Sequence, residues 1–372
     1  MKPSKIKKIF RILLIISLGS LFITMPKVEP AEQMDVVVAL GVDVEKVTEN
    51  DYVYVVTRSA YVFEEENKRS SKVITTRGDS VSLTRESRQQ LADKPVISGL
   101  EKIYIMNENY ARYGIKTYTD FLYKNPHVND TGIFAICKNS SKDILEYIIP
   151  GYASSADFIE GMIINQRGMN FFPDEFDAAN IYVRMGSEGR SIVLPYIELT
   201  QDGMVIVGEA LFKEDKMVAK VDIKESKILN MLKYDNVRGI LTLQNTSKEY
   251  IDFSAKTKRK VKCYKEDDKY KFIIDLSLKG EIISNTQNQS ISRNTASIKE
   301  FENAMAEQVK KECSEFIDKI KNEFKVDSLC LGRVAAAKYG RRKGNDWNKI
   351  IEDSNIQVNV TVKIDKQGRG DF

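Results

Sequence analysis

Residues able to do chemistry are sparse in this chain of 372 residues, and their spacing matches none of the common catalytic motifs. The only histidine, His127, follows a proline, so a His-based zinc site or a Ser-His-Asp triad would depend on this one side chain. The sequence has no GxxxxGKS/T loop, no GxGxxG turn and no GxSxG elbow. We therefore predict a non-enzymatic protein without catalytic, cofactor-binding or metal-binding residues, with His127 in a solvated loop.

The acidic residues and the cysteines leave two alternatives open. Among 53 acidic residues some carboxylate pair can always form, so an exported hydrolase remains an alternative. The four cysteines, Cys137, Cys263, Cys313 and Cys330, contain no CxxC pair, which excludes a zinc knuckle and a thioredoxin-type motif. We expect Cys137 and Cys313 to be core thiols, and a disulfide between Cys313 and Cys330 remains open.

Three other features favour simple structural interpretations. The only tryptophan, Trp347, is expected to pack against the preceding helix, with a partner surface as the alternative. The basic runs at 256–262 and 338–343 are expected in solvated loops or at strand edges. We assign the tripeptide Arg369-Gly370-Asp371 to chance.

The charge balance argues against a nucleic-acid partner. The net charge is +4, but residues 1–28 contain six basic residues and no acidic one. The rest of the chain carries 51 basic residues against 53 acidic ones. A nucleic-acid-binding protein is expected to show an excess of basic residues, which the bulk count does not provide.

The pattern of elements predicts an α+β fold with several domains, in which mixed and antiparallel sheets pack with helices. Alternating and β-branched runs predict strands, and apolar residues at spacings of three and four predict helices. Strands are expected at 34–44, 52–62, 102–106, 133–137, 191–199, 204–212, 217–223, 261–264 and 270–278, and helices at 80–92, 107–113, 118–123, 142–148 (capped by Ser141), 156–166, 173–183 and 225–233.

The clearest element is a long amphipathic helix at 298–324. Ser297 and Glu300 have the spacing of a capping box, and one apolar stripe runs the length of the segment. The strand at 356–364 alternates strictly between apolar and polar residues, so we expect the helix to pack on this strand. The domains are predicted as a signal or anchor segment at 1–31, an N-terminal α+β region at 32–200 that could comprise two lobes, and a C-terminal α+β domain at 201–372.

The N-terminus has the composition of an export signal. Lysine and arginine occupy positions 2, 5, 7, 8 and 11, and residues 12–25 read ILLIISLGSLFITM. A basic region followed by a short apolar run directs export, and the basic end stays in the cytoplasm. Fourteen uncharged residues are fewer than the roughly 20 that span a bilayer, so cleavage remains an alternative to the favoured retained anchor.

The collinear order of four stretches resembles the Ger(x)C family, the C subunits of nutrient germinant receptors in endospore-forming bacteria. The stretches are VVVALGVDVEK from Val36, the segment 100–146 beginning LEKIYIMNENYARYGI, the segment 208–233 reading GEALFKEDKMVAKVDIKESKILNMLK, and the long helix followed by KVDSLCLGRVAAAKYGRRKGNDWNKI and the closing strand. The resemblance extends over nearly the whole chain after the anchor segment.

Two positions depart from the family pattern. The family carries a lipidated cysteine just after the signal, but residues 24–33 read TMPKVEPAEQ and contain no cysteine. We therefore assign no lipidation site and expect a retained helix as the anchor. A glycine of the family's strand pattern is replaced by Ala219.

The resemblance implies a non-enzymatic, extracytoplasmic subunit of a germinant receptor. It would lie on the outer face of the spore inner membrane with two integral-membrane subunits, A and B, and any contact with the nutrient would be indirect. The resemblance implies no cofactor and no catalytic residue. A stand-alone exported ligand-binding protein is the main alternative, and an enclosed pocket with convergent polar groups would favour it.

Overall fold

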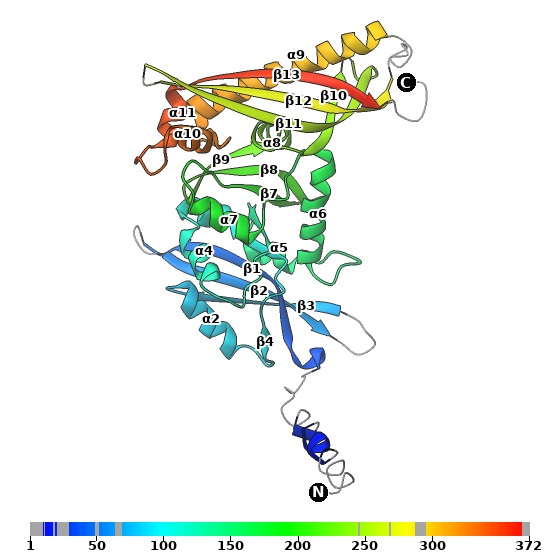
Figure 1. The fold of residues 1–372 in the computed structure, drawn as a ribbon. Helices are drawn as coiled ribbons and strands as arrows, with labels where there is room; N and C mark the ends of the chain where they lie inside the picture. Colours follow the sequence, from blue (N-terminus) through cyan, green and yellow to red (C-terminus); the bar gives the residue numbers. More distant parts are fainter. Residues whose placement is uncertain are drawn as a thin grey trace.

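The computed structural model describes residues 10, 12–17, 19, 20, 30–48, 52–63, 69–244, 246–267, 269–286 and 295–366. Two sheets and their helices form an elongated body (Figure 1). A nine-stranded sheet occupies the N-terminal part, and a four-stranded sheet lies at the opposite end of the body. This architecture confirms the predicted α+β class.

The nine-stranded sheet is mixed. Its order is β3-β2-β1-β5-β6-β7-β8-β9, with β4 paired to β1. Strands β1, β5, β6 and β7 are parallel to one another, and antiparallel hairpins extend the sheet at both ends. The strands are β1 (Asp35–Lys46), β2 (Tyr52–Phe63), β3 (Arg69–Gly78), β4 (Val96–Ile97), β5 (Ile103–Asn107), β6 (Ile133–Cys137), β7 (Val193–Thr200), β8 (Gly203–Lys213) and β9 (Lys216–Asp222).

The central strands are buried on both faces because helices cover each side of the sheet. Every residue of β5 and β6 is buried. Tyr104 and Phe134 pack with the helices on one face, whereas Ile103 and Ala135 pack with those on the other. The first face carries α2 (Val81–Gln90), α3 (Glu108–Tyr113), α4 (Lys116–Tyr123) and α7 (Ala178–Met185), and the second carries α5 (Ser141–Glu146) and α6 (Ser155–Met169).

Among the helix starts that differ from the sequence predictions are those of α5 and α7. Helix α5 begins one residue earlier than expected, because the side chain of Ser140, and not that of Ser141, caps it. Helix α7 begins at Ala178 and not at residue 173. Asp177 accepts a hydrogen bond from the backbone of Asn180 and caps the helix there, while the preceding residues form a buried non-helical segment.

The sequence analysis missed strands β3 and β10 (Arg238–Gln244). Both lie at the edge of their sheets. An edge strand has a paired neighbour on one side only, and these two carry few apolar residues in alternation. Their pattern was therefore too weak to separate them from loops.

The C-terminal sheet has the order β10-β11-β12-β13. Strands β11 (Tyr250–Glu266) and β12 (Lys269–Asn285) form a hairpin much longer than predicted, and β13 (Asn355–Lys366) runs parallel to β12. A parallel pair needs a long crossover connection. The crossover contains α9 (Thr295–Lys319), a π-helical turn (Ile320–Phe324), α10 (Leu331–Tyr339) and α11 (Trp347–Asp353).

The predicted packing of the long helix on the last strand is confirmed. Met305, Val309 and Cys313 of the α9 stripe are fully buried and share one core with Val358 and Val362 of β13. The predicted capping box is wrong, because α9 already includes Thr295 and Ala296, which places Ser297 inside the helix. The regular α-helix also ends at Lys319, where the π-helical turn begins.

The predicted domain division at 200/201 falls within the hairpin of β7 and β8. These strands pair with each other from Val193 to Leu211, so the nine-stranded sheet continues across the division. Helix α8 (Ile223–Lys233) then connects this sheet to the C-terminal one. The two parts of the chain therefore share an uninterrupted sheet and a connecting helix.

Most of the predicted anchor segment lies outside the described residues. Residues 12–17 are helical, and the side chains from Ile12 to Ile16 are 51–68% exposed. In the described part of the chain, no helix combines the length and the apolar composition needed to cross a membrane. Whether the segment is retained or cleaved stays a prediction.

Replacing Phe301 by alanine tests the packing of α9. Phe301 is 3% exposed, and its ring meets that of Phe253 edge to face with the centroids 5.6 Å apart. We expect the free energy of unfolding to fall by about 3–5 kcal/mol in urea titrations. The matched change Lys310→Ala, on the exposed side of α9, should alter it by less than about 0.5 kcal/mol. Equal effects of the two changes would contradict this packing.

Candidate functional site at the junction of the two sheets

The structure places His127 in an exposed turn after α4, as predicted. Its backbone N–H donates to Asn125 Oδ1. Within the described ranges, no group of three or more His, Cys, Asp or Glu residues is arranged to hold a metal ion.

The four cysteines are free thiols. Cys137 on β6 and Cys313 on α9 are fully buried, as predicted. Cys313 belongs to the core between α9 and the C-terminal sheet, whereas Cys330 lies beside Ser191, next to the nine-stranded sheet. The alternative of a Cys313–Cys330 disulfide is therefore wrong for this structure.

Trp347 packs on the preceding helix, as predicted, and also connects the two parts of the chain. It is 5% exposed, and a Cβ on Gly332 of α10 would meet its indole at 2.5 Å. Its Nε1 donates to Oε1 of Glu188, which lies between α7 and β7, over 3.0 Å. The basic run at 338–343 lies at the end of α10 and in the loop after it, and the tripeptide at 369–371 lies outside the described residues.

The prediction for the basic run at 256–262 is wrong in one respect. The run belongs to β11, which is an inner strand of the four-stranded sheet and neither a loop nor an edge. Lys256, Lys258, Lys260 and Lys262 are exposed, as expected of a solvated run.

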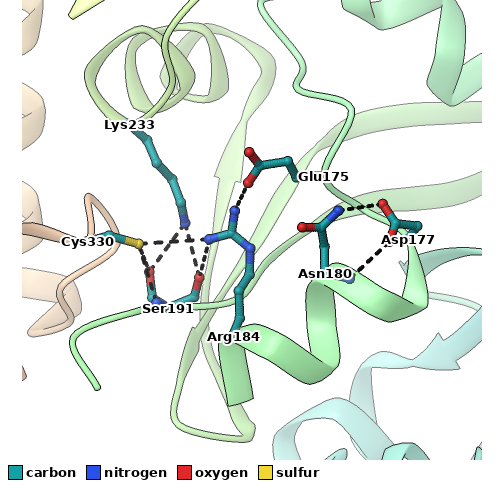
Figure 2. A network of polar contacts seen from close by, with 7 residues as sticks. All are labelled: Glu175, Asp177, Asn180, Arg184, Ser191, Lys233 and Cys330. Atoms are coloured by element: carbon teal, nitrogen blue, oxygen red, sulfur yellow. Dashed lines mark hydrogen bonds and ion pairs between the residues drawn. The ribbon is translucent and has the colours of Figure 1, made fainter. Parts of the chain in front are cut away.

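A cluster of polar side chains lies where the two sheets meet (Figure 2). Arg184 comes from α7, Lys233 from the end of α8, and Cys330 from the residue before α10. All three converge on Ser191, just before β7 (Figure 2). We call Arg184, Ser191, Lys233 and Cys330 the junction cluster.

Ser191 supplies the shared hydrogen-bonding groups of the junction cluster. Its carbonyl oxygen accepts from Arg184 Nη1 and from Lys233 Nζ, each over 3.3 Å, and its N–H donates to Cys330 Sγ over 3.4 Å. The Nη2 atom of Arg184 forms an ion pair with Glu175. Arg184 and Lys233 are 7% and 6% exposed, so two cations are buried at one backbone carbonyl.

The pKa values of Lys233 and Cys330 are both lowered, but for different reasons. Burial lowers the pKa of Lys233 to about 8, because the ammonium group loses water. Burial by itself would raise the pKa of the Cys330 thiol, but Lys233, Arg184 and the Ser191 N–H together hold it below its usual value. The cluster therefore favours the thiolate form of Cys330.

Two buried carboxyl groups lie around the junction cluster. Glu209 of β8 has no exposed surface, and burial raises its pKa to about 8 although Lys233 acts to lower it. Its Oε2 accepts from Asn230 Nδ2 of α8 over 2.9 Å. Asp327 accepts from the backbone N–H groups of Leu331 and Gly332 at the start of α10, and burial raises its pKa to about 6.

Close backbone contact also joins the two parts of the chain at this junction. Gly189 has φ +67°, and its carbonyl oxygen accepts from the N–H of Arg333 in α10 over 3.0 Å. A Cβ at this position would lie 2.3 Å from the Arg333 nitrogen. Only glycine permits so close an approach at a positive φ.

The junction cluster borders an open cleft of about 760 Å³. The lining of the cleft has a net positive charge, because it contains more basic than acidic side chains. Arg184, Lys233 and Cys330 contribute to it from the junction cluster. Four further basic residues, Arg167, Arg238, Arg259 and Arg333, line it together with the acidic Asp174, Glu175 and Asp235. Such a lining can hold a small anion. His127, the only histidine of the chain, is not part of this lining.

The sequence analysis did not identify the junction cluster. Arg184 and Ser191 are seven positions apart, but Lys233 lies 42 positions and Cys330 lies 139 positions after Ser191. One signal was available: Glu209 and Lys233 interrupt the apolar stretches GEALF and ILNMLK. Charged residues in such stretches are seldom fully buried unless they are paired.

Alkylation rates test the electrostatics of the junction cluster. We expect iodoacetamide at neutral pH to modify Cys330 before the other three thiols, because it is partly exposed and its pKa is lowered, whereas burial raises the pKa of Cys263 to about 11. Peptide mapping by mass spectrometry gives the rates. Lys233→Met should slow modification of Cys330, and an unchanged rate would show that Lys233 does not stabilise the thiolate.

The pH dependence of stability tests the burial of Glu209. Its pKa rises from an ordinary 4.5 to about 8 on folding, so the folded protein retains a proton that the unfolded chain releases. The free energy of unfolding should therefore fall as pH rises through this window. Between pH 6 and 8, above the shifted pKa of Asp327, Glu209→Gln should flatten this slope. Glu307→Gln, at an exposed site on α9, is the control, and equal slopes in wild type and Glu209→Gln would contradict the prediction.

Comparison with known proteins matches both parts of the chain to spore germination families. Residues 27–199 match the family model described as spore germination protein N-terminal domain. Residues 207–368 match the model described as spore germination B3/GerAC like, C-terminal. The interval between the two matches lies in and beside the turn from β7 to β8.

A curated relative and a solved structure agree with this result. Spore germination protein GerQC of Bacillus cereus is 21% identical over 305 residues, which cover 80% of this chain and 83% of the relative. The crystal structure of the GerBC protein superposes with a TM-score of 0.58 at 16% identity, covering 88% of this chain and 97% of that one. The similarity to GerBC confirms the fold. The chain belongs to the Ger(x)C family of spore germination proteins, the C subunits of germinant receptors.

Proposed function

We propose that the protein is a non-enzymatic subunit of a nutrient germinant receptor. It acts on the outer face of the spore inner membrane, together with integral-membrane A and B subunits. The observation that carries the proposal is the match of both family models, in order, to residues 27–199 and 207–368. The basic and apolar composition of residues 1–25 supports export, because it has the pattern of a signal or anchor segment.

The polar groups of the junction support a structural role over a catalytic one. Hydrolysis by a carboxyl pair needs one group free to donate a proton and another free to act as base or nucleophile. Asp327 instead binds two backbone N–H groups at the start of α10, and Glu209 binds the side chain of Asn230. We therefore favour the receptor subunit over an exported hydrolase.

Ligand binding by the protein alone is the second candidate, and the junction cleft is the observation that favours it. Two of its basic side chains, Arg184 and Lys233, are more than nine-tenths buried. A nutrient with a carboxylate group would complement them. The cleft is open at the surface of the body, whereas small-molecule sites commonly bury most of the ligand. We therefore rank this function below the receptor subunit.

The apolar segment at 12–25 is proposed to remain as the membrane anchor. No cysteine occurs between residues 1 and 136, so no cysteine near the segment can carry a lipid. The exposed side chains from Ile12 to Ile16 support this role, because they are not covered by the body of the protein. A retained helix would keep the body at the membrane without lipidation.

Co-purification from spore membranes tests the receptor role. An affinity tag is placed after Phe372, and the membranes are solubilised in mild detergent. We expect the protein to be recovered with two multi-span membrane proteins at stoichiometric ratio. An equally tagged, unrelated single-anchor protein from the same membranes is the control, and it should recover neither.

Recovery of the protein alone, from the soluble fraction, would contradict both the receptor role and the retained anchor. Binding of a nutrient by the purified chain without membrane subunits, detected by isothermal titration calorimetry, would favour the second candidate. Recovery from membranes with partners, together with an N-terminal peptide that maps downstream of residue 25, would contradict only the anchor.

A further inference from the structure

The outer face of the C-terminal sheet carries a row of basic residues that crosses all four strands. Arg238 of β10 pairs with Lys256 of β11, Lys256 pairs with Lys279 of β12, and Lys279 pairs with Lys363 of β13. Residues paired directly across strands point to the same face of a sheet. The four side chains therefore form one line, with neighbouring strands about 4.8 Å apart. We call Arg238, Lys256, Lys279 and Lys363 the basic row.

The neighbouring rows extend the positive charge along β11. Lys258, Lys260 and Lys262 follow at every second position, so they share the face of the basic row. The acidic residue within these rows is Asp275, which pairs with Lys262 over 2.8 Å and with Asn359 over 2.8 Å. These four rows carry seven basic residues and one acidic residue, and the next row on the other side of the basic row adds Glu281 of β12, opposite Ser254.

The opposite face of the same sheet is covered. Phe272, Ile274, Leu276 and Leu278 of β12 are buried in a core to which α8, α9, α10 and α11 all contribute. The members of the basic row are exposed, and Arg238, at the start of β10, also borders the junction cleft. The long α9 therefore buries one face of the sheet and leaves the charged face open to solvent.

The basic row is unfavourable for the isolated protein. Like charges directly opposite each other destabilise a pair of strands, and this row contains three such pairs. Within the described part of the chain, no ion pair or hydrogen bond to these four side chains offsets the repulsion. A negatively charged partner would offset this repulsion. The arrangement therefore favours binding of such a partner at a cost to the stability of the isolated protein.

The composition of the face identifies the kind of partner. Protein interfaces are enriched in aromatic residues and depleted in lysine, whereas the residues between the lysines here are mostly polar, such as Ser277 and Thr361, with Ile273 as the apolar exception. Arginine supplies the bidentate geometry for defined carboxylate or phosphate groups, and six of these seven basic residues are lysines. Lysine side chains on a flat face suit a surface with many mobile negative charges.

We propose that the outer face of the C-terminal sheet binds the surface of an anionic lipid bilayer, with the basic row as its main contact. Each basic residue held near such a surface adds to the attraction, and the attraction decays within a Debye length. The inference concerns a second membrane contact, far along the chain from the segment at 1–31. It rests on the charges of the sheet and not on the receptor role.

Flotation with lipid vesicles tests the proposal on the full chain. The quadruple variant R238Q/K256Q/K279Q/K363Q is compared with K124Q/K224Q/K310Q/K349Q, which removes the same charge from four exposed lysines elsewhere. Vesicles of phosphatidylcholine alone, and of phosphatidylcholine with phosphatidylglycerol, are used at low and high salt. Because the N-terminal segment is identical in all proteins, differences between the variants report on the sheet.

We expect the ratio of binding to anionic over neutral vesicles to fall at least about tenfold in the basic-row variant. In the control variant this ratio should fall less than about twofold. High salt should remove the preference of the wild type. Equal losses in the two variants would overturn the proposal. The proposal would also be wrong if the basic-row variant kept its vesicle binding but lost co-purification with membrane proteins, since the partner would then be a protein.

A charge-preserving variant guards against a folding artefact. K256R/K279R/K363R retains every positive charge and should retain the preference for anionic vesicles. Both glutamine variants should have the same circular dichroism spectrum as the wild type. A loss of binding in the arginine variant would show that charge alone does not account for the contact and would contradict the proposal.

Discussion

Helix α8 lies between the two sheets, and the rest of the structure depends on how its buried surface is satisfied. Six consecutive residues, from Ile228 to Lys233, are buried. Its apolar side chains join the C-terminal core, while Asn230 and Lys233 need polar partners away from water. Glu209 of the nine-stranded sheet meets Asn230, and Ser191 meets Lys233. The junction cluster therefore follows from burying the C-terminal half of this helix on all sides.

Strong periodic patterns made much of the fold predictable from sequence. The α9 stripe and the alternation in β13 each extend over many residues, so their burial against each other followed directly. Strands β3 and β10 were missed because they lie at sheet edges and show little alternation of apolar and polar residues. The start of α7 was misplaced because tertiary packing of Phe172 and Phe176 outweighs local helical spacing. The junction cluster combines single residues from distant segments, and no local pattern indicates that they meet.

The comparison of sequence and structure also explains why the family match indicates a function more clearly than any single site does. The chain belongs to the Ger(x)C family along nearly its whole length, while the buried cations Arg184 and Lys233 are bound to the Ser191 carbonyl oxygen at the junction of the two sheets. The basic character of the C-terminal sheet became visible only with the strand register. In sequence, Lys256, Lys279 and Lys363 lie in separate segments, and the balanced total charge conceals them. In the proposed receptor role, the protein would act through such surfaces.

The central claim is that the two family segments form one unit, joined by α8 and the junction cluster. Urea unfolding followed by two probes tests this claim most directly. Fluorescence of Trp347, whose indole binds Glu188 across the junction, reports on the contact between the segments, and far-ultraviolet circular dichroism reports on both sheets. The account predicts a single transition with the same midpoint for the two probes. Two separate transitions, with loss of the Trp347 signal before that of the sheets, would contradict it.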